Sequence, residues 1–257
     1  MKDYGTRMVA AVTTSHTLIA QMIEIIMLAR TPEASRPTSQ FLEPESERPS
    51  FDELPNRKVL QLRSTPKAVV AYNPLGRPRV EVVSVLVSTA EAITVLHNDV
   101  AVAAQLNPTW AAGKSGSIAT DKYELWFEVT VPAFGFATYL ITAGDASGLK
   151  RATKATAVAT SVVSGSTLGG GTFAIESSGG GFFSGDYTFT TGDGQAVTFD
   201  RTSGFMKSVT SASTSLTTSV QLQFVTYGVG KGKDRQSPSG AYLFMPNGNA
   251  QSYQPDR

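Results

Sequence analysis

The sequence contains no cysteine and only two histidines, His16 and His97. Without cysteine the chain has no disulfide, no thiolate nucleophile and no cysteine-ligated metal site. His16 falls in a predicted helix, where we expect it to pack at the helix boundary, and His97 precedes the Asn98-Asp99 turn, where we expect it to be solvated. Two isolated histidines without HExxH spacing do not make a zinc site. The sequence therefore predicts no metal ligands and no catalytic residue.

Charge is also scarce, and neither sign dominates. Charged residues make up 17% of the chain, with 22 Lys and Arg against 21 Asp and Glu, for a net charge of +1. Proteins that bind nucleic acid or anionic membranes carry an excess of basic residues, so we expect neither partner. The most apolar run, residues 18–29, is interrupted by Gln21 and Glu24 and falls short of the about 20 apolar residues that a membrane span needs. We therefore expect no membrane contact.

Residues 1–30 predict one amphipathic helix. Apolar side chains recur there at spacings of three, four and seven, which places them on one helical face; they are Met8, Val12, Ile19, Met22, Ile23, Ile26 and Met27. No second helical pattern follows, so the face has no predicted helical partner. We expect exposure, and hence association, at Ile19, Ile23, Ile26 and Met27.

Residues 31–56 are rich in proline and glutamate, which predicts an extended linker without regular structure. From residue 57 to 145 short β-branched and aromatic runs alternate with turn residues. Six strands without intervening helices predict a small antiparallel β-sandwich, at 68–72, 80–87, 92–96, 100–106, 123–131 and 136–142. Residues 146–257 begin with a Ser-, Thr- and Gly-rich stretch and continue with further strands. The fold class is therefore mainly β, with sandwich domains after one long helix.

The strand at 123–131 shows the clearest alternation in the sequence. Leu125, Phe127 and Val129 fall on one face of this strand, so they are predicted to fill the sandwich core. Trp126 shares the other, more exposed face with glutamates. Acids beside predicted turns, such as Asp200 and Asp234, are interpreted as turn residues rather than as the carboxylate pair of a glycosidase.

Five stretches in order carry a resemblance to a known family. They are "DYGTR" at 3–7, "YNPLG" at 72–76, "VPAFGFATY" at 131–139, "FDRTSG" at 199–204 and "GKDRQSPSGAYLFMPNGNA" at 232–250. Together they resemble the middle and C-terminal regions of glycoside hydrolase family 38 α-mannosidases, closer to the Golgi mannosidase II branch than to the lysosomal one. The resemblance implies the last helix of a three-helix bundle at 1–30, a linker at 31–56, a small sandwich at 57–145, and the opening strands of a large β domain at 146–257.

The same resemblance implies a function for a longer parent protein. These enzymes are retaining exo-glycosidases that act on mannose-containing glycans with an aspartate nucleophile and a zinc ion. The α/β domain that carries both has no counterpart in this sequence, so we expect a non-catalytic portion that binds no cofactor itself. Its partners would be the N-terminal catalytic domain and, through the parent, the glycan. The expected compartment is the Golgi lumen or secretory pathway, with the lysosome or vacuole as the alternative.

Tyr242 is the one residue to which the resemblance gives a role, because the family's tyrosine at this position faces the sugar-binding site. A phenol combines a hydrogen-bonding tip with an apolar ring that suits a sugar face. The alternative is a core tyrosine in a closing strand. Two other hypotheses stay open for the whole chain, namely a stand-alone carbohydrate-binding or scaffold β module without catalysis, and an incomplete gene model.

Overall fold

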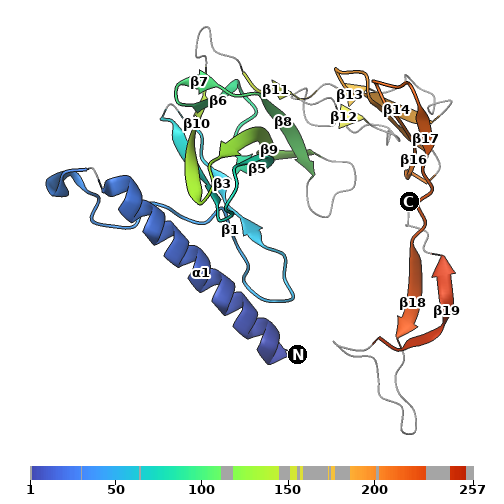
Figure 1. Cartoon of the computed structure of the whole chain (residues 1–257), viewed down its shortest axis with the longest axis horizontal. Coiled ribbons are helices and arrows are strands. Elements are labelled where there is room, and N and C mark those ends of the chain that lie inside the picture. The colour runs from blue at the N-terminus through green and yellow to red at the C-terminus, as the bar shows by residue number, and fades with distance from the viewer. Residues whose placement is uncertain are drawn as a thin grey trace. The chain divides into compact units, whose positions relative to one another are not determined.

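A computed structural model of the chain describes residues 2–29, 31–63, 65–110, 118–144, 151–154, 157–158, 173, 175–176, 186–200, 203–229 and 244–252. One long helix, α1 (Lys2–Leu28), precedes a series of strands, and the chain divides into two compact units, Met1–Ser177 and Ser178–Arg257 (Figure 1). The predicted class, mainly β with antiparallel sheets and one N-terminal helix, is confirmed.

The first unit contains a β-sandwich. Its four-stranded sheet has the order β4 (Lys67–Asn73), β10 (Gly135–Ala143), β6 (Ile93–His97) and β7 (Val100–Ala101). The five-stranded sheet has the order β11 (Thr153–Lys154), β8 (Ala104–Trp110), β9 (Ile118–Val131), β5 (Arg79–Val87) and β3 (Val59–Leu60). A further pair joins β12 (Ala157–Val158) to β13 (Ile175–Glu176).

The pairing differs from the prediction at two places. The edge strands β3 and β11 pair in parallel with β5 and β8, whereas the inner strands are antiparallel. The predicted single strand at 100–106 is two strands, because the chain leaves the four-stranded sheet after β7 and enters the other sheet at β8.

The core lies between the two sheets and follows the predicted alternation. On β9, Leu125, Phe127 and Val129 are at most 2% exposed, while Glu128 is exposed and Trp126 is half-buried. The prediction for this strand, including the outward position of Trp126, is confirmed. Burial of each large apolar side chain contributes about 1.5–3 kcal/mol through the hydrophobic effect.

Tyr139 of β10 lies at the centre of this core. Its ring contacts Phe127 at a centroid distance of 5.5 Å and stacks on His97 at 4.7 Å. Its hydroxyl accepts a hydrogen bond from the Thr130 backbone nitrogen at 2.7 Å. His97 is half-buried, and its Nδ1 donates to the Thr138 carbonyl oxygen at 2.9 Å. The prediction that His97 is solvated is therefore wrong, because its ring packs against a core tyrosine.

Two of the stretches that carry the family resemblance meet at one end of the sandwich. Asn73, which is 2% exposed, donates from Nδ2 to the carbonyl oxygens of Arg77 at 2.8 Å and Pro132 at 2.9 Å. Its Oδ1 accepts from the Leu75 backbone nitrogen at 3.1 Å. One buried amide thus joins the turn at 73–77 to the turn at 132–135.

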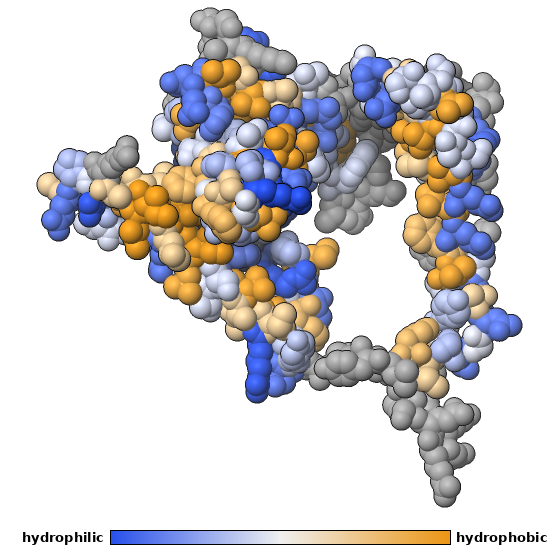
Figure 2. Space-filling view, in the orientation of Figure 1, coloured by the Kyte–Doolittle hydropathy of each residue, from blue (hydrophilic) through white to orange (hydrophobic). Residues whose placement is uncertain are grey.

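α1 presents only part of its apolar face to the rest of its unit. Ile23 is 7% exposed and Ile26 is 59% exposed, while Ile19 and Met27 are half-buried. The expectation that all four are exposed is therefore wrong, most clearly for Ile23. Figure 2 shows apolar residues along α1. The expectation that the apolar run of this helix falls short of a membrane span is not upheld, because the helix from Asp3 to Leu28 is long and apolar enough to cross a membrane. Core helices of soluble proteins and signal sequences share this property.

The second unit is a four-stranded antiparallel sheet and a hairpin. The sheet consists, in order, of β14 (Tyr187–Thr190), β15 (Ala196–Phe199), β16 (Met206–Thr210) and β17 (Thr217–Ser219). The hairpin pairs β18 (Val225–Val229) with β19 (Pro246–Ser252). Asp200 lies in a turn, as predicted, and its Oδ1 accepts from the Ser203 backbone nitrogen at 2.7 Å.

Candidate functional site: the cleft between helix and strap

Residues 40–58, here called the strap, run alongside α1 and are fixed to it at two points. Near one end, Glu24 Oε1 accepts hydrogen bonds from the backbone nitrogens of Phe41 at 2.7 Å and Leu42 at 2.5 Å. Near the other end, the Phe51 ring lies so close to Gly5 that a Cβ on Gly5 would come within 2.6 Å of Phe51 Cγ. Both contacts require the strap to follow the helix.

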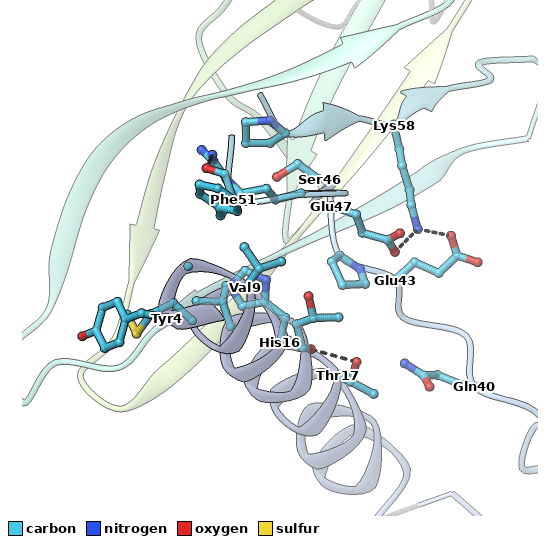
Figure 3. Close-up of a pocket in the computed structure, with 17 residues that line it drawn as sticks. Tyr4, Val9, His16, Thr17, Gln40, Glu43, Ser46, Glu47, Phe51 and Lys58 are labelled. Atoms are coloured by element: carbon cyan, nitrogen blue, oxygen red, sulfur yellow. Dashed lines mark hydrogen bonds and ion pairs between the residues drawn. The ribbon is translucent and has the colours of Figure 1, made fainter. Parts of the chain in front are cut away.

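A cleft of about 780 Å³ lies between the helix and the strap. In Figure 3, Val9 and His16 of the helix lie opposite Phe51 and Glu47 of the strap. His16 was predicted to pack at the helix boundary; it is exposed and lines the cleft. The cleft combines apolar walls with a polar rim, which is typical of binding sites. Its described lining includes Met8, Val12, Pro44, Pro55, Gln40, Glu43 and Lys58.

Five charged side chains of the strap form ion pairs with one another or with the sandwich; they are Glu43, Glu45, Glu47, Arg57 and Lys58. Lys58 Nζ lies 2.9 Å from Glu43 Oε2 and 3.4 Å from Glu47 Oε1. The hydrogen bond to Glu43, helped by Glu47, raises the pKa of Lys58 above its ordinary value. The pKa of Lys58 is therefore higher in the folded than in the unfolded chain, so its pairing stabilises the fold fully below the pKa of the unfolded chain, neutral pH included. That stabilisation is lost at strongly alkaline pH, as the pH rises through the raised pKa.

Arg57 connects the strap to the sandwich. Its guanidinium contacts Glu45 Oε1 of the strap at 2.5 Å and Glu124 Oε1 of β9 at 2.7 Å, and it donates to the Ser84 carbonyl oxygen of β5 at 2.7 Å. Arg57 is also the last residue of the short strand β2 (Asn56–Arg57), which pairs with β1 (Ser46–Glu47). The linker at 31–56 was predicted to lack regular structure, which is wrong for β1, for Asn56 of β2 and for the 3-10 turn Glu33–Ser35.

The sequence itself contains a pattern that favours these ion pairs. Glutamates at 43, 45 and 47 recur with the period of an extended chain, so they share one side of it. Two adjacent cations, Arg57 and Lys58, follow close enough in the sequence for the two segments to pair as a hairpin. Opposite charges on paired extended segments attract, so this pattern favours pairing of the two segments.

The described side chains do not fit a zinc ion. Among the residues of known position, no group of three or more His, Asp or Glu could hold a metal. The carboxylates of Glu43 and Glu45 are bound by Lys58 and Arg57, and His97 Nδ1 donates to the Thr138 carbonyl oxygen. Tyr242 and Asp234 lie outside the described residues, so the role of Tyr242 stays a prediction. The cleft between the helix and the strap, with its apolar walls and polar rim, suits an amphipathic ligand. Its described lining gives no indication of a proton-transfer reaction.

Gly5→Ala is expected to destabilise the first unit by about 1–3 kcal/mol, because Phe51 must move from its packed position. In a Phe51→Ala background the same change should instead stabilise by about 1 kcal/mol, since alanine is the better helix former. Urea unfolding of the four variants, followed by circular dichroism, measures both values. An equal effect in the two backgrounds would show that Phe51 does not pack on Gly5.

Comparison with known proteins identifies relatives over almost the whole chain. A family model described as "Lysosomal alpha-mannosidase-like, central domain" matches residues 102–141. Alpha-mannosidase 2x of Mus musculus is 27% identical over 99% of this chain, and Alpha-mannosidase 2 of Homo sapiens is 28% identical over 98%. The predicted resemblance to family 38 α-mannosidases is confirmed. Alpha-mannosidase 2 of Drosophila melanogaster is 30% identical over 72% of this chain. The chain covers 21% of the length of the two mammalian α-mannosidases.

Proposed function

We propose that this chain is a non-catalytic portion of a retaining α-mannosidase that hydrolyses α-mannosidic bonds of N-glycans. The observation that carries the proposal is the match to α-mannosidases over 98–99% of the chain, together with a family model for a central domain. The chain corresponds to about a fifth of those enzymes, as its 21% coverage shows.

Under this proposal the chemistry belongs to other parts of the parent protein. A retaining glycosidase needs a nucleophile and an acid/base carboxyl group about 5–5.5 Å apart. The family resemblance implies that both carboxyl groups, together with the zinc ion, belong to an N-terminal α/β domain. The described residues of this chain would support that domain, and Tyr242 would help to position the sugar. The Golgi lumen is the proposed compartment, with the lysosome or vacuole as the alternative.

The test is an assay on an aryl α-mannoside with and without zinc. The 257-residue chain should show no turnover above a blank, whereas a longer polypeptide that includes the preceding coding sequence should show zinc-dependent turnover. In that longer protein, Tyr242→Ala should lower turnover while zinc content, measured by metal analysis, stays unchanged. Metal-dependent turnover by the 257-residue chain alone would contradict the proposal.

A further inference from the structure

The outer face of the five-stranded sheet carries a group of side chains that the proposed function does not use. Trp126 lies at its centre on β9, directly opposite Ser84 of β5 and Gln105 of β8. Because paired residues in neighbouring strands point to the same side of a sheet, these side chains share one face. In Figure 1, β8, β9 and β5 lie side by side.

The rows on either side of Trp126 complete this surface, which we call the Trp126 platform. Toward one end, Asn107 lies opposite Glu124. Toward the other end, Glu128 lies opposite Val82, which is 62% exposed. With strands about 4.8 Å apart and about 3.4 Å per residue, the platform measures about 10 Å across and about 14 Å along the strands. Arg57 covers one corner of it, where its guanidinium donates to Ser84 Oγ at 3.1 Å and pairs with Glu124 Oε1 at 2.7 Å. The remaining area accommodates a short oligosaccharide.

Hydrogen bonds within the platform hold its polar groups in position. Gln105 Nε2 donates to Asn107 Oδ1 at 2.7 Å, which leaves the Gln105 oxygen as an acceptor and the Asn107 nitrogen as a donor for a ligand. Trp126 Nε1 donates to Glu124 Oε2 at 3.2 Å, and Arg57 holds the other oxygen of Glu124 at 2.7 Å. The indole is therefore fixed at its edge, and its orientation is maintained by an ion pair.

We propose that the Trp126 platform binds the pyranose rings of a glycan. The indole of Trp126 and the exposed side chain of Val82 offer an apolar surface for the C–H groups of a sugar face. The amides of Gln105 and Asn107 and the exposed carboxylate of Glu128 offer both donors and acceptors for hydroxyl groups. A protein partner would more often meet a larger apolar centre from which charged residues are depleted. The proposal does not depend on the catalytic role of the parent.

The experiment measures binding of mannotetraose, with cellotetraose as a second probe, to the 257-residue chain. In the Trp110→Phe variant Trp126 is the sole tryptophan, so its fluorescence should change saturably with one or both sugars. Trp126→Ala should weaken binding by about tenfold or more in isothermal titration. Gln105→Ala, which removes an exposed side chain, should weaken it by severalfold and leave thermal unfolding unchanged.

Trp110→Ala is the matched control. Trp110 is 55% exposed and lies on the same strand as Gln105, about 17 Å away at five residues' separation. Its removal should leave the affinity unchanged. The proposal is overturned if neither sugar binds saturably, or if Trp110→Ala weakens binding as much as Trp126→Ala. It is equally overturned if platform variants alter self-association, measured by sedimentation, without altering sugar binding. These outcomes are independent of the α-mannosidase assay, so a failure of sugar binding at the platform would not contradict the proposed function.

Discussion

Tyr139→Ala should lower the free energy of unfolding of the first unit by about 3–5 kcal/mol, as expected for deletion of a large core aromatic. Tyr139 is 1% exposed, and its ring lies between Phe127 and His97. The substitution leaves a cavity and also removes the hydroxyl that accepts from the Thr130 backbone nitrogen. Urea unfolding followed by circular dichroism measures the change.

Tyr139→Phe separates the two contributions. It keeps the ring and removes the hydroxyl, so we expect a loss of about 1–2 kcal/mol, the cost of an unsatisfied, partly buried backbone nitrogen. If Tyr139→Phe were as destabilising as Tyr139→Ala, the hydroxyl rather than ring packing would dominate. If neither variant changed stability, the assignment of Tyr139 to the core would be wrong.

Phe127→Ala should also cost about 3–5 kcal/mol, and Trp126→Ala should cost clearly less. The two residues are adjacent on β9, but Phe127 is 1% exposed in the core while Trp126 lies half-buried on the outer face. The comparison tests the strand register, because a slip of one residue exchanges the two faces. The reverse order of effects in urea unfolding would show such a slip.

Phe127 and Tyr139 contact each other, so their substitutions should not be additive. A double-mutant cycle should give a coupling free energy of about 0.5–1.5 kcal/mol, typical of an aromatic pair. Val82→Ala, on the outer face where the side chain is 62% exposed, is the matched control and should show no coupling to Tyr139.

The sequence correctly predicted those helices and strands in which the hydrophobic periodicity extends over enough residues to be recognised. The alternation at 123–131 correctly placed Phe127 inside and Trp126 outside, because every second residue of a strand faces the core. The spacing of apolar residues correctly predicted α1. It did not predict which part of that face is buried, since Ile23 is covered by tertiary contacts while Met22, its neighbour, is 62% exposed.

Features that depend on contacts between distant segments were not predictable in this way. The parallel edge strands β3 and β11 have two residues each, which is too short to show any period. The cleft exists because Glu24 and Phe51 fix the strap to the helix, and no local pattern reports such a contact. The platform around Trp126 requires the register of three strands. The alternation in the sequence predicts which side chains face outward on only one of them, β9.

The pairing of β4 with β10 has a consequence for how the chain is made. The paired residues of β4 and β10 lie between 62 (Gly135 and Asn73) and 74 (Ile141 and Lys67) positions apart along the chain, and ribosomes add roughly 5–20 residues per second. During synthesis, β4, with the apolar sequence "AVVAY", is therefore unpaired for several seconds before its partner strand β10 has been made. An unpaired apolar strand is a template for pairing with other chains. Newly made chains should consequently depend on chaperones until residue 143 has left the ribosome, and slower translation between β4 and β10 should increase aggregation.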